Sequence, residues 1–153
     1  MSKCFVFLII LPCLLYGCNR PSSPFCIGIQ DKSDPKGVVG YYDSLYNPAG
    51  TFLSRDSIPV AWYDDFRPQF EKRFADIRFQ WGRETRIWLN LCCSPQGKIE
   101  HALYHSSSFA SPEVEQRFSQ EAENFLKGFT FRLRAQKPYS QCGTLIFKAD
   151  TTK

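Results

Sequence analysis

Apolar residues recur with a helical period in the middle of the chain. From residue 60 onward they follow spacings of four and three, at Trp62, Phe66, Phe70, Phe74 and Ile77. This spacing places them on one face of a helix. Asp64 and Asp65 suit the start of a helix, and Pro68 fits a helix that begins just before it. The pattern predicts a helix over 62–77 with one buried face.

A second helical pattern follows a capping signal. Ser111 is a suitable N-cap, Pro112 suits the first helical position, and Glu113 favours the positive end of the helix dipole. Gly128 is a stop signal near the end of the pattern. The apolar stripe of this predicted helix is formed by Val114, Phe118, Ala122, Phe125 and Phe129.

Between these two helices, apolar and polar residues alternate with a period of two. The stretch "RIWLNLCC" reads as a strand with one buried face, and "SPQG" after it reads as a turn. Pro95 sets φ for a type I turn, and Gly97 can take the positive φ of a following bulge. We expect a hairpin in which Leu91 pairs with Ile99 and Ile87 pairs with Leu103, because this register gathers apolar residues on one face.

The stretch "QCGTLIFKA" reads as a third strand, with Leu145, Phe147 and Ala149 on one face. Placed antiparallel beside the first strand, it sets Ile87 opposite Phe147 and Leu89 opposite Leu145. The predicted fold is therefore α+β in two layers: a three-stranded antiparallel sheet, order 2-1-3, packed with two helices.

The same strand register sets Cys92 opposite Cys142 on the other face, so we predict a disulfide between them. Cys93 then points into the core, with Cys26 as its candidate partner from the N-terminal segment. An even number of cysteines in an exported domain favours disulfides. Buried free thiols are the alternative, and zinc has less support because there is no CxxC pair.

Residues 19–58 are rich in Gly, Pro, Ser and Asp. We expect residues 25–60 to form an irregular segment that packs on an α+β domain at 61–150 through its tyrosines. The outer face of the predicted sheet carries an aromatic patch of Trp88, Tyr104 and Ile146. Such a patch often marks a partner site. The alternative is that residues 25–58 fold over this face and bury it.

The N-terminus holds about a dozen apolar residues, "CFVFLIILPCLL", fewer than the roughly 20 that span a bilayer. It has the length of the apolar region of a secretory signal. Leu15-Tyr16-Gly17-Cys18 resembles a bacterial lipobox, although the residue in the place of Tyr16 is usually smaller. The resemblance implies a signal peptide at 1–17, lipidation of Cys18 and a tether at 18–24. Asn19 then implies the outer membrane, facing the periplasm. An ordinary signal peptide and an uncleaved anchor are the alternatives.

Charge and composition narrow the function further. Removal of residues 1–17 from the 153 leaves 136, which suits a single domain. The net charge of +4 is spread without a basic block, so we expect no nucleic-acid partner. The sequence does not fix the oligomeric state.

Catalytic patterns are weak. The only two histidines, His101 and His105, would lie about 13 Å apart on a strand, too far to share a metal ion. There is no nucleophile elbow, HExxH motif or phosphate-binding loop. Asp64 and Asp65 are explained by a helix start, and residues 106–108 by a loop before the N-cap. We expect no enzyme, no cofactor and no metal site.

The order of elements, with "SPQGKI" as the turn and "HSSS" before the second helix, resembles the C-terminal domain shared by TonB and TolA. The resemblance covers roughly residues 62–150. "KGFTFRL" lacks the proline that the family often has after its second helix. The family's long anchoring helix and spacer are also missing, which argues against a motor-coupled energy transducer.

The resemblance implies a protein partner in the cell envelope that pairs with the free edge of the third strand. In this chain the edge comprises Cys142, Gly143, Thr144, Leu145, Ile146, Phe147 and Lys148. We therefore expect a non-catalytic lipoprotein, tethered to the membrane, that binds such a partner. One alternative is an inhibitory, immunity-type lipoprotein that inserts "YYDSLYNPAG" into a toxin or envelope enzyme. The others are a transducer with an uncleaved anchor and, last, a hydrolase.

Overall fold

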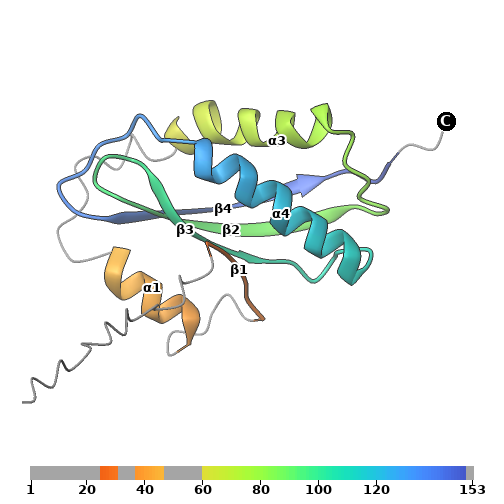
Figure 1. Cartoon of the computed structure of the whole chain (residues 1–153), viewed down its shortest axis with the longest axis horizontal. Coiled ribbons are helices and arrows are strands. Elements are labelled where there is room, and N and C mark those ends of the chain that lie inside the picture. The colour runs from red at the N-terminus through yellow and green to blue at the C-terminus, as the bar shows by residue number, and fades with distance from the viewer. Residues whose placement is uncertain (1–24, 31–36, 47–59, 151–153) are drawn as a thin grey trace, which may run out of the picture.

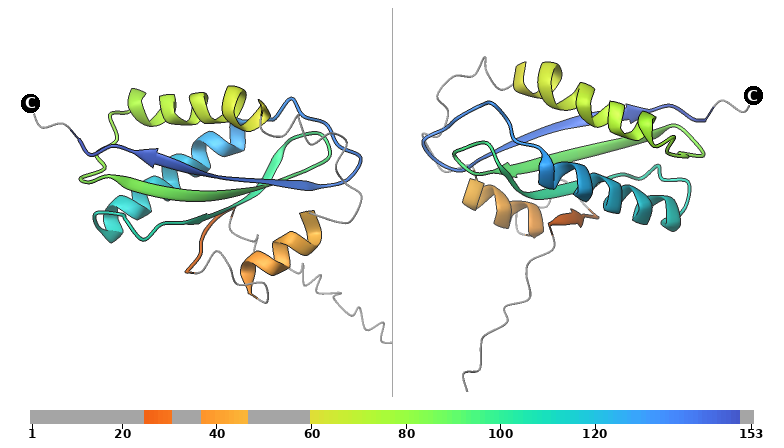
Figure 2. Two further views of the ribbon diagram at one scale, coloured as in Figure 1. Left: turned by 180° about the vertical axis from the view of Figure 1, so that it is seen from behind. Right: turned by 45° about the horizontal axis from the view of Figure 1, so that its top comes forward.

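The computed structural model describes residues 25–30, 37–46 and 60–150 (Figure 1). Its elements in chain order are β1 (Cys26–Gly28), α1 (Val38–Tyr46), η1 (Ala61–Phe66), α3 (Arg67–Asp76), β2 (Thr85–Cys93), β3 (Ile99–His105), α4 (Pro112–Gly128) and β4 (Tyr139–Phe147). The strands form one sheet in the order β1-β3-β2-β4. Helices α3 and α4 cover one face of the sheet and α1 lies on the other (Figures 1 and 2).

The predicted fold class is wrong, because the N-terminal segment contributes a further strand and a further helix. β2 pairs antiparallel with both β3 and β4, but β1 adds to β3 in parallel and makes a four-stranded mixed sheet. The part of residues 25–60 that is described contains β1 and α1, where irregular chain was expected. The predictions for the signal peptide 1–17, for Cys18 and for the tether 18–24 lie outside the described residues.

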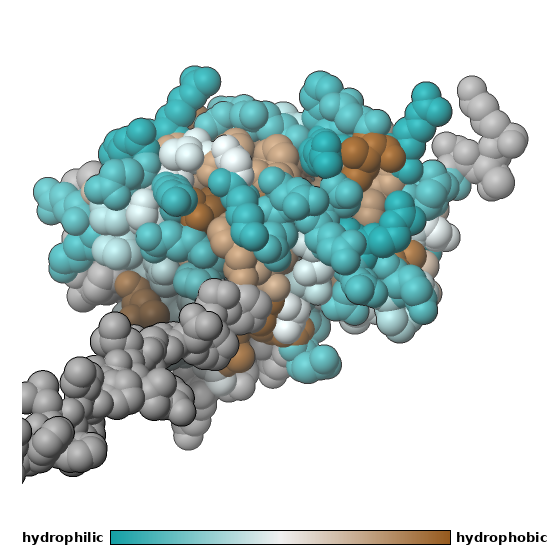
Figure 3. Space-filling view, in the orientation of Figure 1, coloured by the Kyte–Doolittle hydropathy of each residue, from teal (hydrophilic) through white to brown (hydrophobic). Residues whose placement is uncertain are grey.

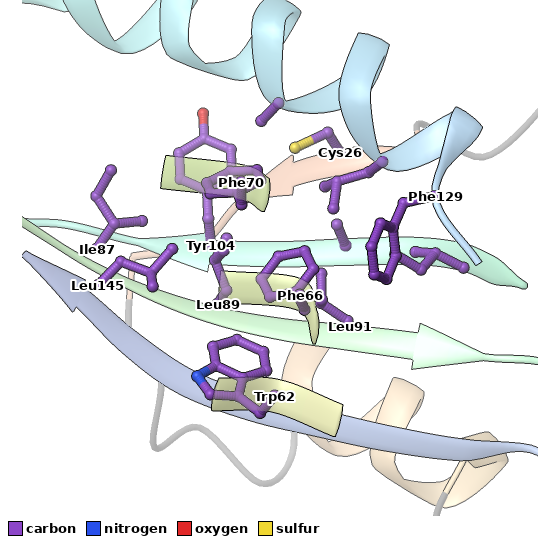
Figure 4. Close-up of a cluster of buried hydrophobic side chains, with 14 of the residues drawn as sticks. Cys26, Trp62, Phe66, Phe70, Ile87, Leu89, Leu91, Tyr104, Phe129 and Leu145 are labelled. Atoms are coloured by element: carbon purple, nitrogen blue, oxygen red, sulfur yellow. The ribbon is translucent and has the colours of Figure 1, made fainter. Parts of the chain in front are cut away.

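An aromatic core fills the space between the sheet and helices α3 and α4. The predicted apolar face of the first helix is buried here at Trp62, Phe66, Phe70 and Phe74, each at most 4% exposed. Phe70 lies 5.0 Å from Phe74 and 5.4 Å from Phe125, measured between ring centres. Figure 4 shows Phe66 and Phe70 near Leu89 and Leu91 of β2. Each fully buried large side chain contributes about 1.5–3 kcal/mol, so this layer carries much of the fold's stability.

The first helix begins with a π-helical turn. Arg67 donates its backbone N–H to the carbonyl of Trp62, five residues earlier. α3 follows, with Pro68 in its first turn, where a missing N–H is tolerated. The turn brings Trp62 down onto β4, where a Cβ on Gly143 would lie 2.4 Å from the indole. Only glycine therefore fits beneath Trp62.

The second helix begins and ends as predicted. Ser111 has an extended backbone, with φ −158°, and its side chain accepts a hydrogen bond from the Val114 N–H at 3.4 Å. α4 ends at Gly128. Ala122 and Phe118 of the predicted stripe are fully buried, and Val114 and Phe125 pack at its border.

The predicted hairpin turn is confirmed, but its register is wrong. Gly97 has φ +83° and donates its N–H to the Ser94 carbonyl at 2.9 Å. A bulge between Cys92 and Cys93 then shifts the register of β2 against β3. Leu91 consequently pairs with Ala102 instead of Ile99, and Leu103 pairs with Asn90 instead of Ile87.

The predicted register of the third strand differs from the structure by two residues. Ile87 lies opposite Leu145, and Leu89 lies opposite Gly143. A shift of two residues would move Gly143 away from the Trp62 indole and bring a residue with a side chain beneath it. The contact between Trp62 and Gly143 therefore fixes this register.

The predicted disulfides are not formed, because the four described cysteines are free. Cys92 lies opposite Ser140, and Cys142 lies opposite Asn90. Cys26 belongs to β1 and Cys93 to β2, with β3 between them. Two strand spacings separate their backbones by about 10 Å, beyond the roughly 7 Å that a disulfide can bridge.

Candidate partner-binding surface

β4 forms the edge of the sheet opposite β1. Within the part of the chain that the structure describes, no strand pairs with β4 on the side away from β2. This edge contains Cys142–Phe147 of the predicted partner-binding stretch, and Lys148 follows directly after β4. The edge strand is nine residues long, "YSQCGTLIF", and carries no charged residue and no proline. Proteins commonly protect edge strands with charges, prolines or bulges, and β4 has neither of the first two.

Side chains along β4 alternate between the core and the outer face. Leu145 and Phe147 point into the core, where they are 0% and 8% exposed. Ile146 points to the outer face and is 42% exposed, with exposed Thr144 beside it. Trp88 pairs with Thr144 and lies half-buried on the same outer face. The structure therefore places Trp88 and Ile146 on the same face of the sheet, but Ile146 lies opposite Arg86 and not opposite Trp88.

Tyr104 does not belong to this surface. Because of the bulge, it pairs with Leu89 and points to the opposite face of the sheet, where it is 6% exposed. Its ring lies 5.3 Å from the ring of Phe118 on α4. Figure 4 shows Tyr104 on the α4 side of the sheet, near Cys26. The prediction that Tyr104 belongs to the outer aromatic patch is therefore wrong.

Three charged side chains border the outer face at one end. Glu84 accepts hydrogen bonds from Lys148 at 3.2 Å and from Arg86 at 3.2 Å. Lys148 and then Arg86 hold the pKa of the Glu84 carboxyl below its usual range. Exposed pairs of this kind contribute little to stability. They do mark where the uncharged part of the edge stops.

The outer face of the hairpin end is covered by α1 through a polar cluster. The Tyr46 hydroxyl donates to Glu100 at 2.9 Å, and the Asn90 amide donates to Asp43 at 3.5 Å. Tyr42 packs on His101, with ring centres 4.9 Å apart. Thus part of the outer face is buried by the N-terminal segment, as the alternative prediction held, while Trp88 and Ile146 remain partly open.

A cysteine, a histidine and a carboxylate meet in this cluster, and they are the residue types of nucleophilic catalysis. Cys92 pairs with His101 across the two strands, and Asp43 lies nearby on α1. Cys92 is 0% exposed, and burial followed by the charges of Asp43 and Glu100 raises the pKa of its thiol to about 12. A thiol that stays protonated is not a nucleophile. The sequence did not indicate this cluster, because the bulge that aligns Cys92 with His101 has no simple pattern.

The other candidate catalytic side chains make structural hydrogen bonds. His105 Nδ1 donates to the Ile29 carbonyl at 3.0 Å, and Asp65 accepts from Gln69 at 2.8 Å. Ser108 Oγ accepts the Arg86 backbone N–H at 2.8 Å and so ties the loop before α4 to β2. Among the described residues, no group of three His, Cys, Asp or Glu side chains is placed to hold a metal ion.

The helical face carries surface hollows. One lies between α3 and α4 and is lined by Gln69, Arg73, Phe125 and Phe129. Arg73 in it is already bound to Glu121 at 2.6 Å. Figure 3 shows polar side chains over most of this face, with apolar surface between them. No set of titratable groups converges in this hollow, so it is a weaker candidate site than β4.

The stretch proposed for insertion into an enzyme is helical where the structure describes it. Residues 41–46 of "YYDSLYNPAG" belong to α1, and Tyr42 and Tyr46 are buried against the sheet. Residues 47–50 lie outside the described residues.

In the described ranges, no helix has the length and apolarity needed to cross a bilayer.

Comparison of the chain with protein-family models, with curated proteins and with solved structures finds no match.

Proposed function

We propose that this chain is a lipid-anchored protein of the bacterial cell envelope that binds a protein partner by strand addition. Cys18 carries the lipid, the outer membrane holds it, and the domain faces the periplasm. The partner pairs as an extended strand with the Cys142–Lys148 edge of β4. The role is one of binding and needs no catalytic group or cofactor.

The observation that carries the proposal is the uncharged edge of β4, with which no strand of the described residues pairs on the side away from β2. In strand addition, backbone hydrogen bonds supply affinity, and side chains on alternate positions supply specificity. The outward positions of β4 include Thr144 and Ile146, with Trp88 beside them on β2. A partner strand can thus pair with the backbone while its side chains meet an apolar surface. The Glu84–Lys148 pair gives that surface a charged border.

Hydrogen exchange and cross-linking together test this proposal. A photo-reactive amino acid replaces Thr144 on β4, and, as a matched control, Gln120, which is exposed on α4. We expect the Thr144 derivative to form an adduct with an envelope protein in living host cells, and the Gln120 derivative to form none. In the purified complex, backbone amides of residues 142–148 should exchange more slowly than in the free chain.

An edge variant separates strand addition from binding elsewhere. Thr144→Lys and Ile146→Lys place charges on the outer positions of β4, which are exposed, so folding should be little affected. Loss of the adduct and of the added amide protection would support the proposal. Unchanged exchange over 142–148 in the complex would contradict it, whatever protein is captured.

A further inference from the structure

Helix α1 has a second apolar face that points away from the sheet. Val39, Tyr42 and Tyr46 are buried against the sheet, at 7%, 6% and 7% exposure. On the outer side, Val38, Tyr41 and Leu45 are 45%, 62% and 48% exposed. Their spacings of three and four align them in one stripe. We call these three residues the outer stripe of α1.

The outer stripe is free of charge. The only charged residue of α1 is Asp43, and it accepts a hydrogen bond from Asn90 of the sheet. The outer side of α1 therefore presents apolar side chains, a tyrosine hydroxyl and Ser44, whose Oγ donates to the Tyr41 carbonyl at 2.7 Å. A surface helix normally turns polar groups outward. Three large apolar side chains together on a nine-residue helix instead mark a contact surface.

The chain enters the domain beside this helix. Phe25, the first described residue, lines the same surface hollow as Tyr46 at the end of α1. Cys18 lies seven residues before Phe25 in the sequence. Seven residues reach at most about 25 Å. A lipid on Cys18 would therefore hold α1 within a short distance of the bilayer surface.

We infer that the outer stripe of α1 rests on the lipid surface to which the chain is tethered. The inference rests on the proposed lipid anchor at Cys18. A short apolar stripe has low affinity for a bilayer by itself. The tether makes the contact intramolecular, so a low affinity is sufficient. Tyr41 suits this place, because its ring favours the boundary between headgroups and acyl chains.

Tryptophan fluorescence in vesicles tests the contact. The full-length chain, lipidated by its own host, is reconstituted into phosphatidylethanolamine–phosphatidylglycerol vesicles with or without brominated acyl chains, which quench tryptophan on contact. The variants are Tyr41→Trp and, as a matched control, Tyr63→Trp. Tyr63 is 58% exposed on η1, across the sheet from α1. The native tryptophans contribute equally to both variants and are subtracted with the wild type.

We expect the emission added by Tyr41→Trp to shift to shorter wavelength and to lose most of its intensity in brominated vesicles. The emission added by Tyr63→Trp should stay unchanged. Equal quenching of the two variants would overturn the inference. So would an unquenched Tyr41→Trp accompanied by cross-linked dimers, which would mean that a second copy covers the stripe.

Failure of the anchor is recognised separately. Intact mass and flotation with the vesicles report whether Cys18 is lipidated and whether the chain is held on the membrane. A chain that keeps Met1 and does not float would overturn both the proposed anchor and this inference. A chain that floats without quenching at Tyr41→Trp overturns the inference alone and leaves the proposed strand addition intact.

Discussion

At the scale of single residues, burial sets the chemistry of the cysteines. Burial raises the pKa of the thiols of Cys26 and Cys92 to about 12, and Cys93 is shifted upward for the same first reason. The thiols of an unfolded chain ionise near 8.5. A folded-state pKa above the unfolded one contributes stability that is complete below the unfolded pKa. That stability is lost as the pH rises toward the folded pKa.

The alkaline pH dependence of stability follows from this shift. Between pH 8 and pH 10, Cys92 ionises in the unfolded chain and not in the folded one, which lowers the free energy of unfolding by about 2 kcal/mol. We expect the wild type to lose about that much more stability than Cys92→Ala over this range, in urea titrations under reducing conditions. Parallel losses in the two proteins would show that Cys92 is not buried as described.

Gly143 allows the Trp62 indole to pack directly on β4. In Gly143→Ala, the added methyl would overlap the Trp62 indole, and we expect a loss of about 1–3 kcal/mol in the free energy of unfolding. Gly128→Ala is the control, because nothing lies within 4 Å of its added methyl. It should be neutral or slightly stabilising. In a Trp62→Ala background the Gly143→Ala substitution should cost much less, and an equal cost there would contradict the contact.

At the scale of elements, the sequence predicts those with a repeated local pattern. Three of these patterns depend only on neighbouring residues, and the structure contains each of them: the helical spacing of Phe66, Phe70 and Phe74, the cap at Ser111 and the turn at Gly97. β1 has only three residues and pairs in parallel, so it shows no alternation. α1 is apolar on two faces and contains Gly40, so its pattern is not that of a simple amphipathic helix.

Strand registers depend on single residues and could not be obtained from patterns alone. A bulge of one residue turns every later side chain to the other face. It moved Tyr104 from the predicted surface into the core, while Trp88 and Ile146 stayed on the surface. In β4 a shift of two residues preserves the faces, so hydrophobicity does not choose between the two registers. The choice is made by Trp62 over Gly143, a contact between residues 81 positions apart.

Because α1 covers Cys92, we predict the order in which the cysteines react with a thiol reagent. Cys142 is exposed, Cys92 lies under α1, and Cys93 lies in the core. We expect Cys142 to react first with a thiol reagent, and Cys92 to follow at a rate set by local opening of α1. Tyr42→Ala removes much of the apolar attachment of α1 and should speed the labelling of Cys92, measured by mass spectrometry of peptides.

Cys93 is the internal control for this experiment. In the Tyr42→Ala protein its labelling should stay far slower than that of Cys92, because its exposure requires the core to open. If Cys92 and Cys93 speed up together, α1 is not an independent cover and the whole domain has been destabilised.

At the scale of the whole molecule, the strand where the chain enters and the proposed partner edge lie at opposite edges of the sheet, and α1 packs on the outer face against β2 and β4. The described chain enters at β1, and the proposed partner edge belongs to β4, with β3 and β2 between them. Three strand spacings amount to about 14 Å. A domain that rests on the bilayer through α1 can thus keep β4 away from its tether. Under the two proposals, one domain would rest on the membrane through α1 and present β4 to its partner.

The length of the tether should control the membrane contact. Inserting ten Gly/Ser residues between Ser22 and Ser23 lengthens the stretch from Cys18 to Phe25 from seven residues to 17. Effective concentration falls roughly as the −3/2 power of linker length, so the equilibrium for contact of α1 with the bilayer should weaken about fourfold. Quenching of Tyr41→Trp by brominated lipid would measure this weakening of the contact between α1 and the bilayer. The Thr144 adduct is the control. The longer tether leaves the fold unchanged, so the Thr144 derivative should still form its adduct as long as β4 can reach the partner. Equal quenching with both tethers would mean that α1 binds lipid without help from the tether.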